Sequence, residues 1–245
     1  MKIFCHLIQG NCLDVLPSLQ EESIDLVVTD PPYNLKQGFQ YDDLSPERFE
    51  SFHTSWMKEV FRVLKHGRIC YITNSQMTMW DFKAIIDKVG FDFVQLIIWK
   101  YSGVIPSKRK PKYRWNMSYQ PIFMLSKGTP NIDIYGKAFK NKLQRTDVWT
   151  FTQCQSNYSG DLKKVHPSQK PIDLIKQMII SSSEPRETIL DPFLGSGTTM
   201  KAARDLNRSC IGIEIDPAYC EIAKNRVFGK QFLDRTVEYK FTIWK

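Results

Sequence analysis

The chain has 245 residues, 42% of them hydrophobic and 24% charged, which is typical of a globular protein and excludes a low-complexity or fibrous chain. Its 34 Lys and Arg outnumber 26 Asp and Glu, giving a net charge of +8 that favours a polyanionic partner. No apolar run approaches membrane-spanning length, and the N-terminus is too short and polar for a signal peptide, so we expect no membrane anchor. The six cysteines include no C-x-x-C pair. We therefore expect a cytosolic protein with reduced thiols, without a metal site or a disulfide framework.

The first half of the chain alternates between apolar runs and helical spacing. We expect strands over residues 4–9, 24–29, 68–73, 93–99 and 119–125, and a single helical turn over residues 14–19. Ser45 and Pro46 begin a helix that we expect to end at His66-Gly67, and a second helix over 79–89 is closed by Gly90. Residues 34–43 are polar and indicate a mobile loop between these elements.

The second half resumes this alternation after an interruption. Residues 129–165 show no sustained periodicity and are polar and basic with interspersed aromatic residues. We then expect helices over 171–181, 200–206 and 217–228, strands over 187–190 and 210–215, and a further strand in the tail 237–244. Strands that alternate with helices indicate an α/β fold with a doubly wound sheet.

The motif Asp30-Pro31-Pro32-Tyr33 ends the second apolar strand, where ligands bind in open α/β sheets. Asp30 offers a carboxylate, the prolines offer carbonyl groups on a stiff backbone, and Tyr33 offers a flat aromatic face. Acceptors beside an aromatic ring suit a planar base with an exocyclic amino group. The simpler interpretation is an acidic strand end followed by a Pro-Pro turn.

A second candidate site lies near the C-terminus. Asp191-x-Phe193-x-Gly195-x-Gly197 joins an apolar strand to a helix, so that the backbone can approach a ligand closely. It lacks the third glycine of a dinucleotide fingerprint and the Gly-Lys of a P-loop. Glu214 ends the next strand, where an acidic side chain can bind ribose hydroxyls. These features predict a nucleoside-containing ligand; the simpler alternative is a glycine-rich turn beside a surface glutamate.

Three motifs in this order resemble the β-class DNA amino-methyltransferases, which have the catalytic motif first and the cofactor motif last. They are the Asp30 motif, the stretch from His166 to Pro171, and the stretch from Asp191 to Thr199. The resemblance covers most of the chain. It implies a mostly parallel, seven-stranded methyltransferase sheet and S-adenosylmethionine as the methyl donor.

The resemblance also implies residue roles. The catalytic residues would be Asp30, Pro31, Pro32 and Tyr33. Asn11 stands where the family usually has Asp and would face the cofactor's adenine, Glu214 would bind its ribose, and Ser168 and Lys170 would close the pocket near the methionine end. The complete implied cofactor set is Asn11, Asp30, Ser168, Lys170, Asp191, Phe193, Gly195, Ser196, Gly197, Thr198, Glu214 and Ile215.

Two basic segments are candidates for DNA contact within what we expect to be one methyltransferase domain over residues 1–245. The loop 101–118 carries aromatic residues among its charges, and segment 129–165 occupies the family's usual position for target recognition. The simpler interpretations are a solvated charged face and a disordered insertion. The candidate DNA-binding residues are Lys108, Arg109, Lys110, Lys112, Arg114, Lys140, Lys142 and Arg145.

Together these features predict a sequence-specific DNA methyltransferase that acts on the exocyclic N6 of an adenine flipped out of the duplex. Asp as the first residue of the Asp30 motif favours adenine, because the cytosine-N4 enzymes more often carry Ser there. The alternatives are a cytosine-N4 enzyme, an RNA or protein-amide methyltransferase, and an inactive DNA-binding module. The expected partners are double-stranded DNA, a second copy of the chain and a cognate restriction endonuclease, in the cytoplasm of a prokaryotic cell.

Overall fold

The computed structural model describes residues 2–36, 41–103, 113, 115–155, 160–163, 165–166, 168–229 and 236–244. The strands are β1 Ile3–Gln9, β2 Ile24–Thr29, β3 Leu64–Thr73, β4 Asp92–Tyr101, β5 Tyr119–Ser126, β6 Val148–Phe151, β7 Thr188–Asp191, β8 Ser209–Glu214 and β9 Val237–Ile243. The helices are α1 Cys12–Val15, α2 Pro46–Val63, α3 Met79–Val89, α4 Ile134–Lys140, α5 Ile172–Ser182, α6 Thr198–Asp205 and α7 Pro217–Phe228, with 3-10 turns at Leu16–Ser18 and Gly160–Leu162.

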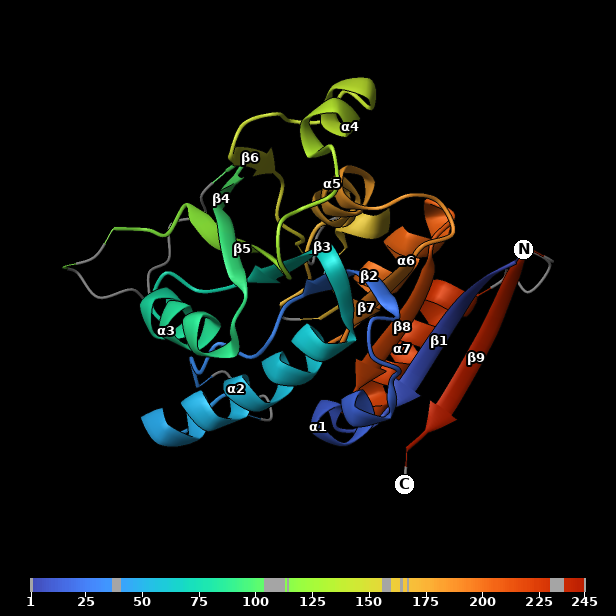
Figure 1. The fold of residues 1–245 in the computed structure, drawn as a ribbon, viewed down its shortest axis with the longest axis horizontal. Helices are drawn as coiled ribbons and strands as arrows, with labels where there is room; N and C mark the ends of the chain where they lie inside the picture. Colours follow the sequence, from blue (N-terminus) through green and yellow to red (C-terminus); the bar gives the residue numbers. More distant parts are fainter. Residues whose placement is uncertain are drawn as a thin grey trace.

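Within these residues the strands form one sheet in the order β6-β4-β5-β3-β2-β7-β8-β1-β9 (Figure 1). Every neighbouring pair is parallel except the two pairs that include β5. From β2 the chain moves outward through β3 and β4, and from β7 it moves outward through β8. The strand order therefore reverses between β2 and β7, which is the position where open α/β sheets bind ligands.

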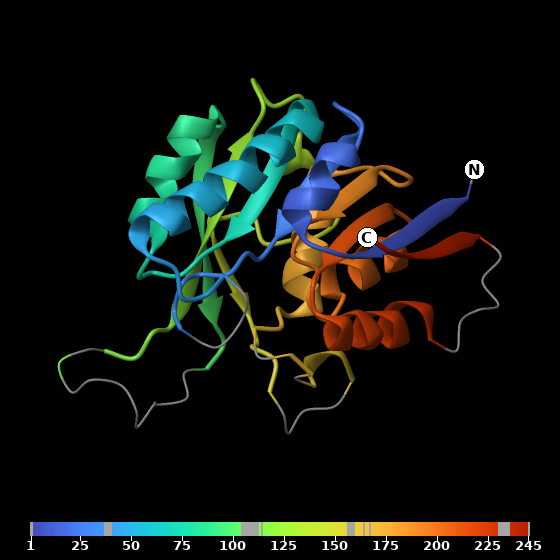
Figure 2. The same ribbon diagram turned by 90° about the horizontal axis from the view of Figure 1, so that it is seen from below.

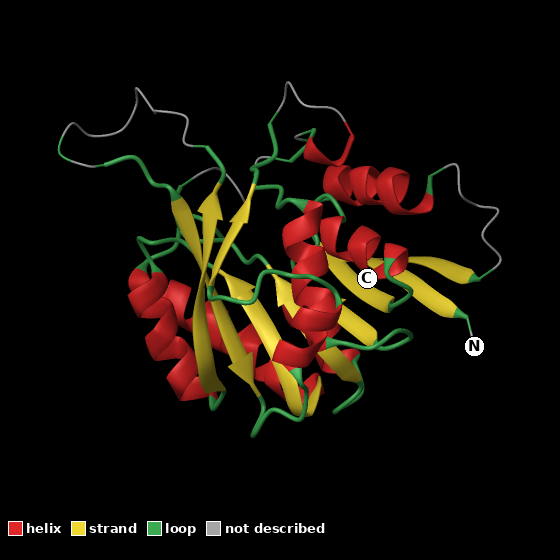
Figure 3. Ribbon diagram, turned by 90° about the horizontal axis from the view of Figure 1, so that it is seen from above, coloured by secondary structure: helices red, strands yellow, loops and turns green. Residues whose placement is uncertain are grey.

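Helices cover both faces of the sheet, and each face has its own apolar core (Figure 3). Helices α1, α2 and α3 pack on one face, and α5, α6 and α7 on the other. Successive side chains of a strand point to opposite faces, so Leu26 and Val28 of β2 enter one core while Val27 enters the other. Strands β1 and β9 pair at one edge, near both chain termini (Figure 2).

The local signals in the sequence explain most element boundaries. The Ser45 side chain accepts a hydrogen bond from the Arg48 N–H, and Pro46 is the first residue of α2, as predicted. Gly90 ends α3 in the left-handed conformation with φ of 99°. The predicted end of α2 at His66-Gly67 is wrong: α2 ends at Val63 and β3 follows directly. Gly67 has φ of 75°, but it belongs to β3, where its N–H bonds to the Lys127 carbonyl and the register with β2 shifts.

The doubly wound α/β prediction is confirmed, whereas the sheet has nine strands within the described residues, not seven. Strand β9 is the strand expected in the C-terminal tail, and β6 is an addition. Both β6 and α4 lie in segment 129–165, where the sequence shows no periodicity. These elements have four and seven residues, too few to give a repeating pattern. No helix of the described chain is long and apolar enough to cross a membrane.

Candidate active site at the carboxyl edge of the sheet

A cavity of about 610 Å³ opens at the carboxyl edge of the sheet, where the strand order reverses. Four strands each bring one polar side chain to it: Asp30 from β2, Asp191 from β7, Glu214 from β8 and Asn11 from β1. The order β2-β7-β8-β1 spreads these groups along the cavity. Because neighbouring strands lie about 4.8 Å apart, the ends of β2 and β1 are separated by roughly 14 Å. The cavity is therefore elongated, with Asp30 at one end and Asn11 at the other.

Asp30 is held by contacts on both carboxylate oxygens. Lys170 donates to Oδ2 over 2.5 Å, while the hydroxyls of Thr73 and Tyr33 donate to Oδ1. Only 7% of the Lys170 side chain and 21% of the Asp30 side chain are exposed. The Lys170 ammonium also donates to the Ser168 carbonyl. This buried ion pair fixes the direction of the carboxylate before any ligand enters.

Tyr33 contributes more than a flat ring. Its hydroxyl bonds to Thr73 as well as to Asp30, and burial together with the Asp30 charge raises the pKa of Tyr33 well above its ordinary value. Lys170 Nζ lies 5.5 Å from the centre of the Tyr33 ring. The predicted stacking role of Tyr33 stays a prediction, and the structure adds a role for its hydroxyl in orienting Asp30.

A second cavity of about 210 Å³ adjoins the first. Tyr33, Ser168, Gln169 and Lys170 line both cavities, so the Asp30–Lys170 pair lies at their junction. The remaining wall of the second cavity combines aromatic rings with amide side chains, which suits a planar ligand with hydrogen-bonding edges. The further lining residues are Leu35, Ser75, Gln76, Trp99, Tyr101, Met117, Tyr119, Gln120, Gln153 and Cys154.

The glycine-rich turn after β7 has the conformation that its glycines allow. Gly195 and Gly197 have φ of 54° and 84°, in the left-handed region that glycine adopts without strain. A Cβ on Gly197 would lie 3.0 Å from the Ala223 Cβ of α7. Gly195 lines the large cavity, whereas Gly197 does not. Gly197 therefore serves the close packing of the turn on α7, and the prediction that it contacts cofactor directly lacks this geometric support.

Asp191 is an unusual carboxyl group because it is buried at the floor of the cavity. Complete burial raises the pKa of Asp191 to about 7, although hydrogen bonds from Thr199, Thr29 and the Phe193 N–H lower it. A cation placed beside such a carboxyl group lowers its pKa, so the group becomes a carboxylate that pairs with the cation. This position therefore suits the ammonium of an amino-acid moiety.

Glu214 and Asn11 form the opposite end of the cavity. Glu214 accepts the N–H groups of Gly195 and Asp216 over 2.7 and 2.8 Å, and burial raises its pKa. Asn11 Oδ1 accepts the Leu13 N–H and so begins helix α1. Backbone groups therefore orient both side chains before any ligand enters the cavity.

The structure brings together nearly all of the predicted cofactor residues. Except for Gly197, every one of the residues proposed to hold the cofactor lines the large cavity, as do Pro31, Pro32 and Tyr33. Sequence reasoning missed Thr73 and Tyr41. Thr73 ends β3 beside β2, so a polar residue at the end of a neighbouring strand was a usable signal. Tyr41 lies in the segment interpreted as a mobile loop, where nothing in the local pattern marked it.

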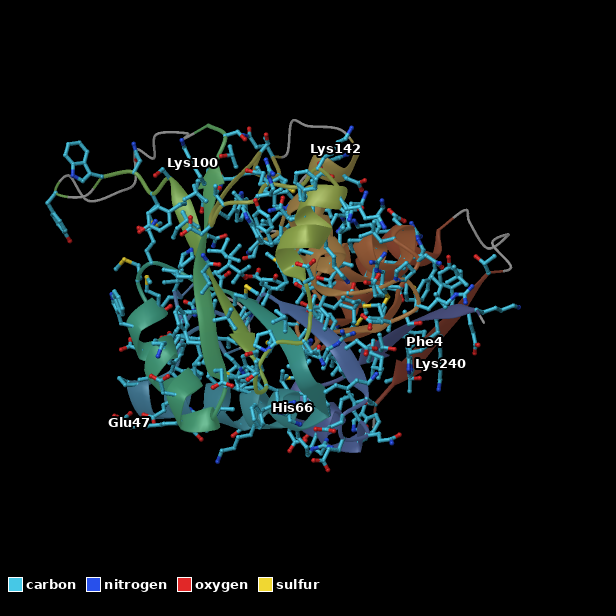
Figure 4. All side chains as sticks on the ribbon, turned by 45° about the horizontal axis from the view of Figure 1, so that its top comes forward. Phe4, Glu47, His66, Lys100, Lys142 and Lys240 are labelled. Carbon is cyan, nitrogen blue, oxygen red and sulfur yellow. The ribbon has the colours of Figure 1, made fainter. Side chains whose placement is uncertain are left out.

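The predicted DNA-binding residues fall into two groups. Lys108, Arg109, Lys110, Lys112 and Arg114 lie outside the described residues. Lys140, Lys142 and Arg145 are exposed on or after α4 and line neither cavity. In Figure 4, Lys142 lies in the upper part of the view with Lys100 of β4, and His66 of β3 lies in the lower part. A phosphate-contacting role for these residues stays a prediction.

In the part of the chain that the structure describes, no group of three or more His, Cys, Asp or Glu side chains is arranged to hold a metal ion. Cys12 lines the large cavity, and burial raises its thiol pKa to about 12. At neutral pH this thiol is protonated and is a poor nucleophile. The polar chemistry of the site therefore rests on Asp30, Lys170, Thr73 and Tyr33.

A doubly wound sheet with an elongated, acid-lined cavity at its switch point defines an α/β enzyme that binds a nucleoside-containing cofactor. Comparison with known proteins gives its family. The sequence model of the N6_N4_Mtase family, described as DNA methylase, matches residues 24–225. The chain belongs to this family of DNA amino-methyltransferases, and the predicted membership of the β class is confirmed.

Individual relatives agree with this assignment. The chain is 35% identical over 237 residues to the type II methyltransferase M.HpaI of Haemophilus parainfluenzae, covering 91% of this chain and 74% of the relative. It is 28% identical over 244 residues to M.HinfI of Haemophilus influenzae, with 90% and 67% covered.

Two solved structures share the fold at 25% identity. The cytosine-N4-specific PvuII DNA methyltransferase has a TM-score of 0.77, with 96% of this chain and 90% of that chain covered. A Thermus thermophilus protein in complex with S-adenosyl-L-methionine has a TM-score of 0.70, with 96% and 98% covered. Family membership confirms S-adenosylmethionine as the predicted cofactor and DNA as the predicted substrate.

Proposed function

We propose that this chain methylates the exocyclic N6 of adenine in duplex DNA, with S-adenosylmethionine in the large cavity and the flipped-out base in the small one. The observation that supports this best is Asp30, which lines the large cavity and is bonded to Tyr33 and Lys170, two residues that line both cavities. A target base is inaccessible inside a duplex, and a separate pocket beside the reactive group is what base flipping requires.

The cofactor fits the large cavity in one direction. Its adenosine would lie at the Asn11 and Glu214 end, with the buried carboxyl of Glu214 toward the ribose hydroxyls. Its amino-acid part would lie toward Asp191, and its sulfonium toward Asp30. When bound, S-adenosylmethionine supplies a methyl group that is already activated for nucleophilic attack.

The protein residues act on the amino group of the base. That nitrogen is a poor nucleophile because its lone pair is delocalised into the ring. If Asp30 and a carbonyl of Pro31 or Pro32 accept its two N–H bonds, the nitrogen is held in the geometry that attack on the methyl group needs. The product nitrogen carries an extra proton, which the Asp30 carboxylate would accept. In the present structure Asp30 Oδ1 accepts from the hydroxyls of Thr73 and Tyr33, and Oδ2 accepts from Lys170. For Asp30 to bind the amino group of the base, Lys170 must share Oδ2 with it or move away.

Cytosine-N4 methylation is the second candidate, favoured by the structural likeness to the cytosine-N4-specific PvuII enzyme. We propose adenine because the motif begins with Asp30. The deciding experiment is transfer of labelled methyl groups from S-adenosylmethionine to unmethylated genomic DNA, followed by digestion to nucleosides and mass spectrometry. N6-methyladenine supports the proposal, and N4-methylcytosine changes the base while keeping the mechanism. Cofactor binding without any modified base would redirect the proposal to RNA or protein.

Further predictions belong to this proposal. A single methyltransferase domain would carry the target-recognition segments 101–118 and 129–165. The protein would work in the cytoplasm. Mapping the modified sites in genomic DNA would supply the recognition sequence. Light scattering of the purified protein tests the expected homodimer. Restriction of unmodified DNA by an extract of the source cell tests for a cognate endonuclease.

A further inference from the structure

Tyr41 and Asn11 form a hydrogen-bonded pair at the end of the large cavity that lies away from Asp30. Asn11 Nδ2 donates to the Tyr41 hydroxyl over 3.1 Å, and both residues line the cavity. Asn11 Oδ1 is engaged by the Leu13 N–H over 3.1 Å. That backbone contact fixes which way the amide faces, so the NH₂ group is directed to Tyr41.

The surroundings hold Tyr41 in an unfavourable backbone conformation. Its φ is 62°, in the left-handed region that residues other than glycine rarely adopt. Its ring stacks on Phe52 of α2, with centroids 4.3 Å apart and planes inclined by 17°. The neighbouring Asp42 carboxylate accepts the Leu35 N–H over 2.8 Å. Strained residues persist where packing determines them, and they concentrate at ligand sites.

The direction of the Asn11–Tyr41 hydrogen bond has a consequence for the cavity. A tyrosine hydroxyl has one proton to donate and lone pairs that accept. Because Asn11 is the donor in this pair, the Tyr41 proton is not used by Asn11. Among the described residues, no protein acceptor takes that proton. Tyr41 and the Asn11 side chain bonded to its hydroxyl both line the cavity, so the hydroxyl proton can serve a ligand there.

We propose that Tyr41 is a cofactor-binding residue whose hydroxyl donates a hydrogen bond to the adenosine part of S-adenosylmethionine, and that Asn11 sets the direction of this bond. The inference rests on the proposed function, because it requires the adenosine at the Asn11 end of the cavity. Asp at position 11 would accept the Tyr41 proton and withdraw it from the cavity. Asn11 and Tyr41 therefore act as a pair.

Binding of S-adenosylhomocysteine, measured by isothermal titration calorimetry, tests this pair without requiring turnover. Tyr41→Phe keeps the stacking on Phe52 and removes only the hydroxyl. We expect it to weaken S-adenosylhomocysteine binding about two- to tenfold, the usual effect of one lost hydrogen bond. The same factor is expected for 5′-methylthioadenosine, which lacks the amino-acid part. Tyr135→Phe, on the exposed surface of α4, is the matched control and leaves both affinities unchanged.

A second variant separates ligand contact from a merely structural role. In an Asn11→Asp background the new carboxylate accepts the Tyr41 proton, so adding Tyr41→Phe should leave the affinity for S-adenosylhomocysteine almost unchanged. Equal losses in both backgrounds, or no loss from Tyr41→Phe in the original chain, would overturn the inference. A chain that binds no S-adenosylhomocysteine at all would instead refute the proposed function on which the inference depends.

Discussion

Replacing Asp30 by Asn tests the centre of the proposed mechanism, because the amide keeps the shape of the side chain and removes its charge. The variant loses the charged acceptor for the amino group of the base. Removing one preorganised electrostatic contact of this kind lowers kcat about 10²- to 10³-fold. Binding of S-adenosylhomocysteine should stay within about threefold of the original, since the groups that line the distant end of the cavity are untouched.

The same substitution leaves the buried Lys170 ammonium without its counter-charge. Breaking a fully buried pair costs about 3–5 kcal/mol, and the partial exposure of Asp30 places this pair nearer 2–3 kcal/mol. For a chain of this size the loss corresponds to a fall in Tm of roughly 5–10 °C. The double variant Asp30→Asn with Lys170→Met removes both charges, so it should regain most of the lost stability while remaining inactive.

Two assays decide the outcome: transfer of labelled methyl groups to DNA, and thermal unfolding followed by circular dichroism. Asp30→Asn with kcat within tenfold of the original would refute the role of the carboxylate. A double variant no more stable than the single one would refute the reasoning on the ion pair. Recovery of activity in the double variant would show that Lys170, not the lost carboxylate, causes the defect.

The remaining predictions concern groups around this centre. Thr73→Val removes a hydroxyl that orients Asp30 and should lower kcat about tenfold or more with cofactor affinity unchanged, while Thr73→Ser restores it; loss of cofactor affinity instead would contradict this. Asp191 holds its proton up to about pH 7 in the folded state but releases it near pH 3.9 when unfolded, so its contribution to the free energy of unfolding falls by at most about 4 kcal/mol as pH rises from 4 to 7. Asp191→Asn should remove this fall in urea titrations at several pH values, and an unchanged slope would refute it. Gly197→Ala should cost about 1–3 kcal/mol because of its φ and its close approach to α7, whereas Gly103→Ala, with open space around the added methyl, should be near neutral in the same titration. If Lys142 contacts a phosphate, Lys142→Gln should reduce the salt dependence of DNA binding by a slope of about 0.9, and an unchanged slope would remove it from the interface.

The sequence predicts the scaffold well where local chemistry decides the structure. β2 and α3 have the expected bounds because a β-branched apolar run and a glycine stop act within a few residues. The predicted end of α2 is wrong because a glycine after an apolar helical pattern is typical of a helix end. In the structure the positive φ of Gly67 instead lets its N–H bond to the Lys127 carbonyl. That contact lies 60 residues away in the chain, so no local pattern could indicate it.

The site shows the same limit. Motifs locate the groups that line the large cavity, but they do not show which groups bond to one another. The pairing of Lys170 with Asp30 joins residues 140 positions apart, and the Thr73 contact joins residues 43 positions apart. Sequence reasoning placed Lys170 near the methionine end of the cofactor. Its contact with the Asp30 carboxylate follows only from the packing of α5, which begins two residues after Lys170, against β2.

The boundary between β2 and β7 joins the two halves of the sheet through only two register pairs, Leu26 with Ile189 and Val27 with Leu190. In the proposed reaction this boundary separates methyl acceptor from methyl donor. Asp30 and Thr73 stand on the half that continues into β4, β5 and β6, and the groups assigned to the donor stand mainly on the half built from β7, β8 and β1. The two halves nevertheless share the apolar core on each face of the sheet, so the distance between methyl donor and methyl acceptor is fixed by packing that crosses the boundary and not by the strand pairing alone.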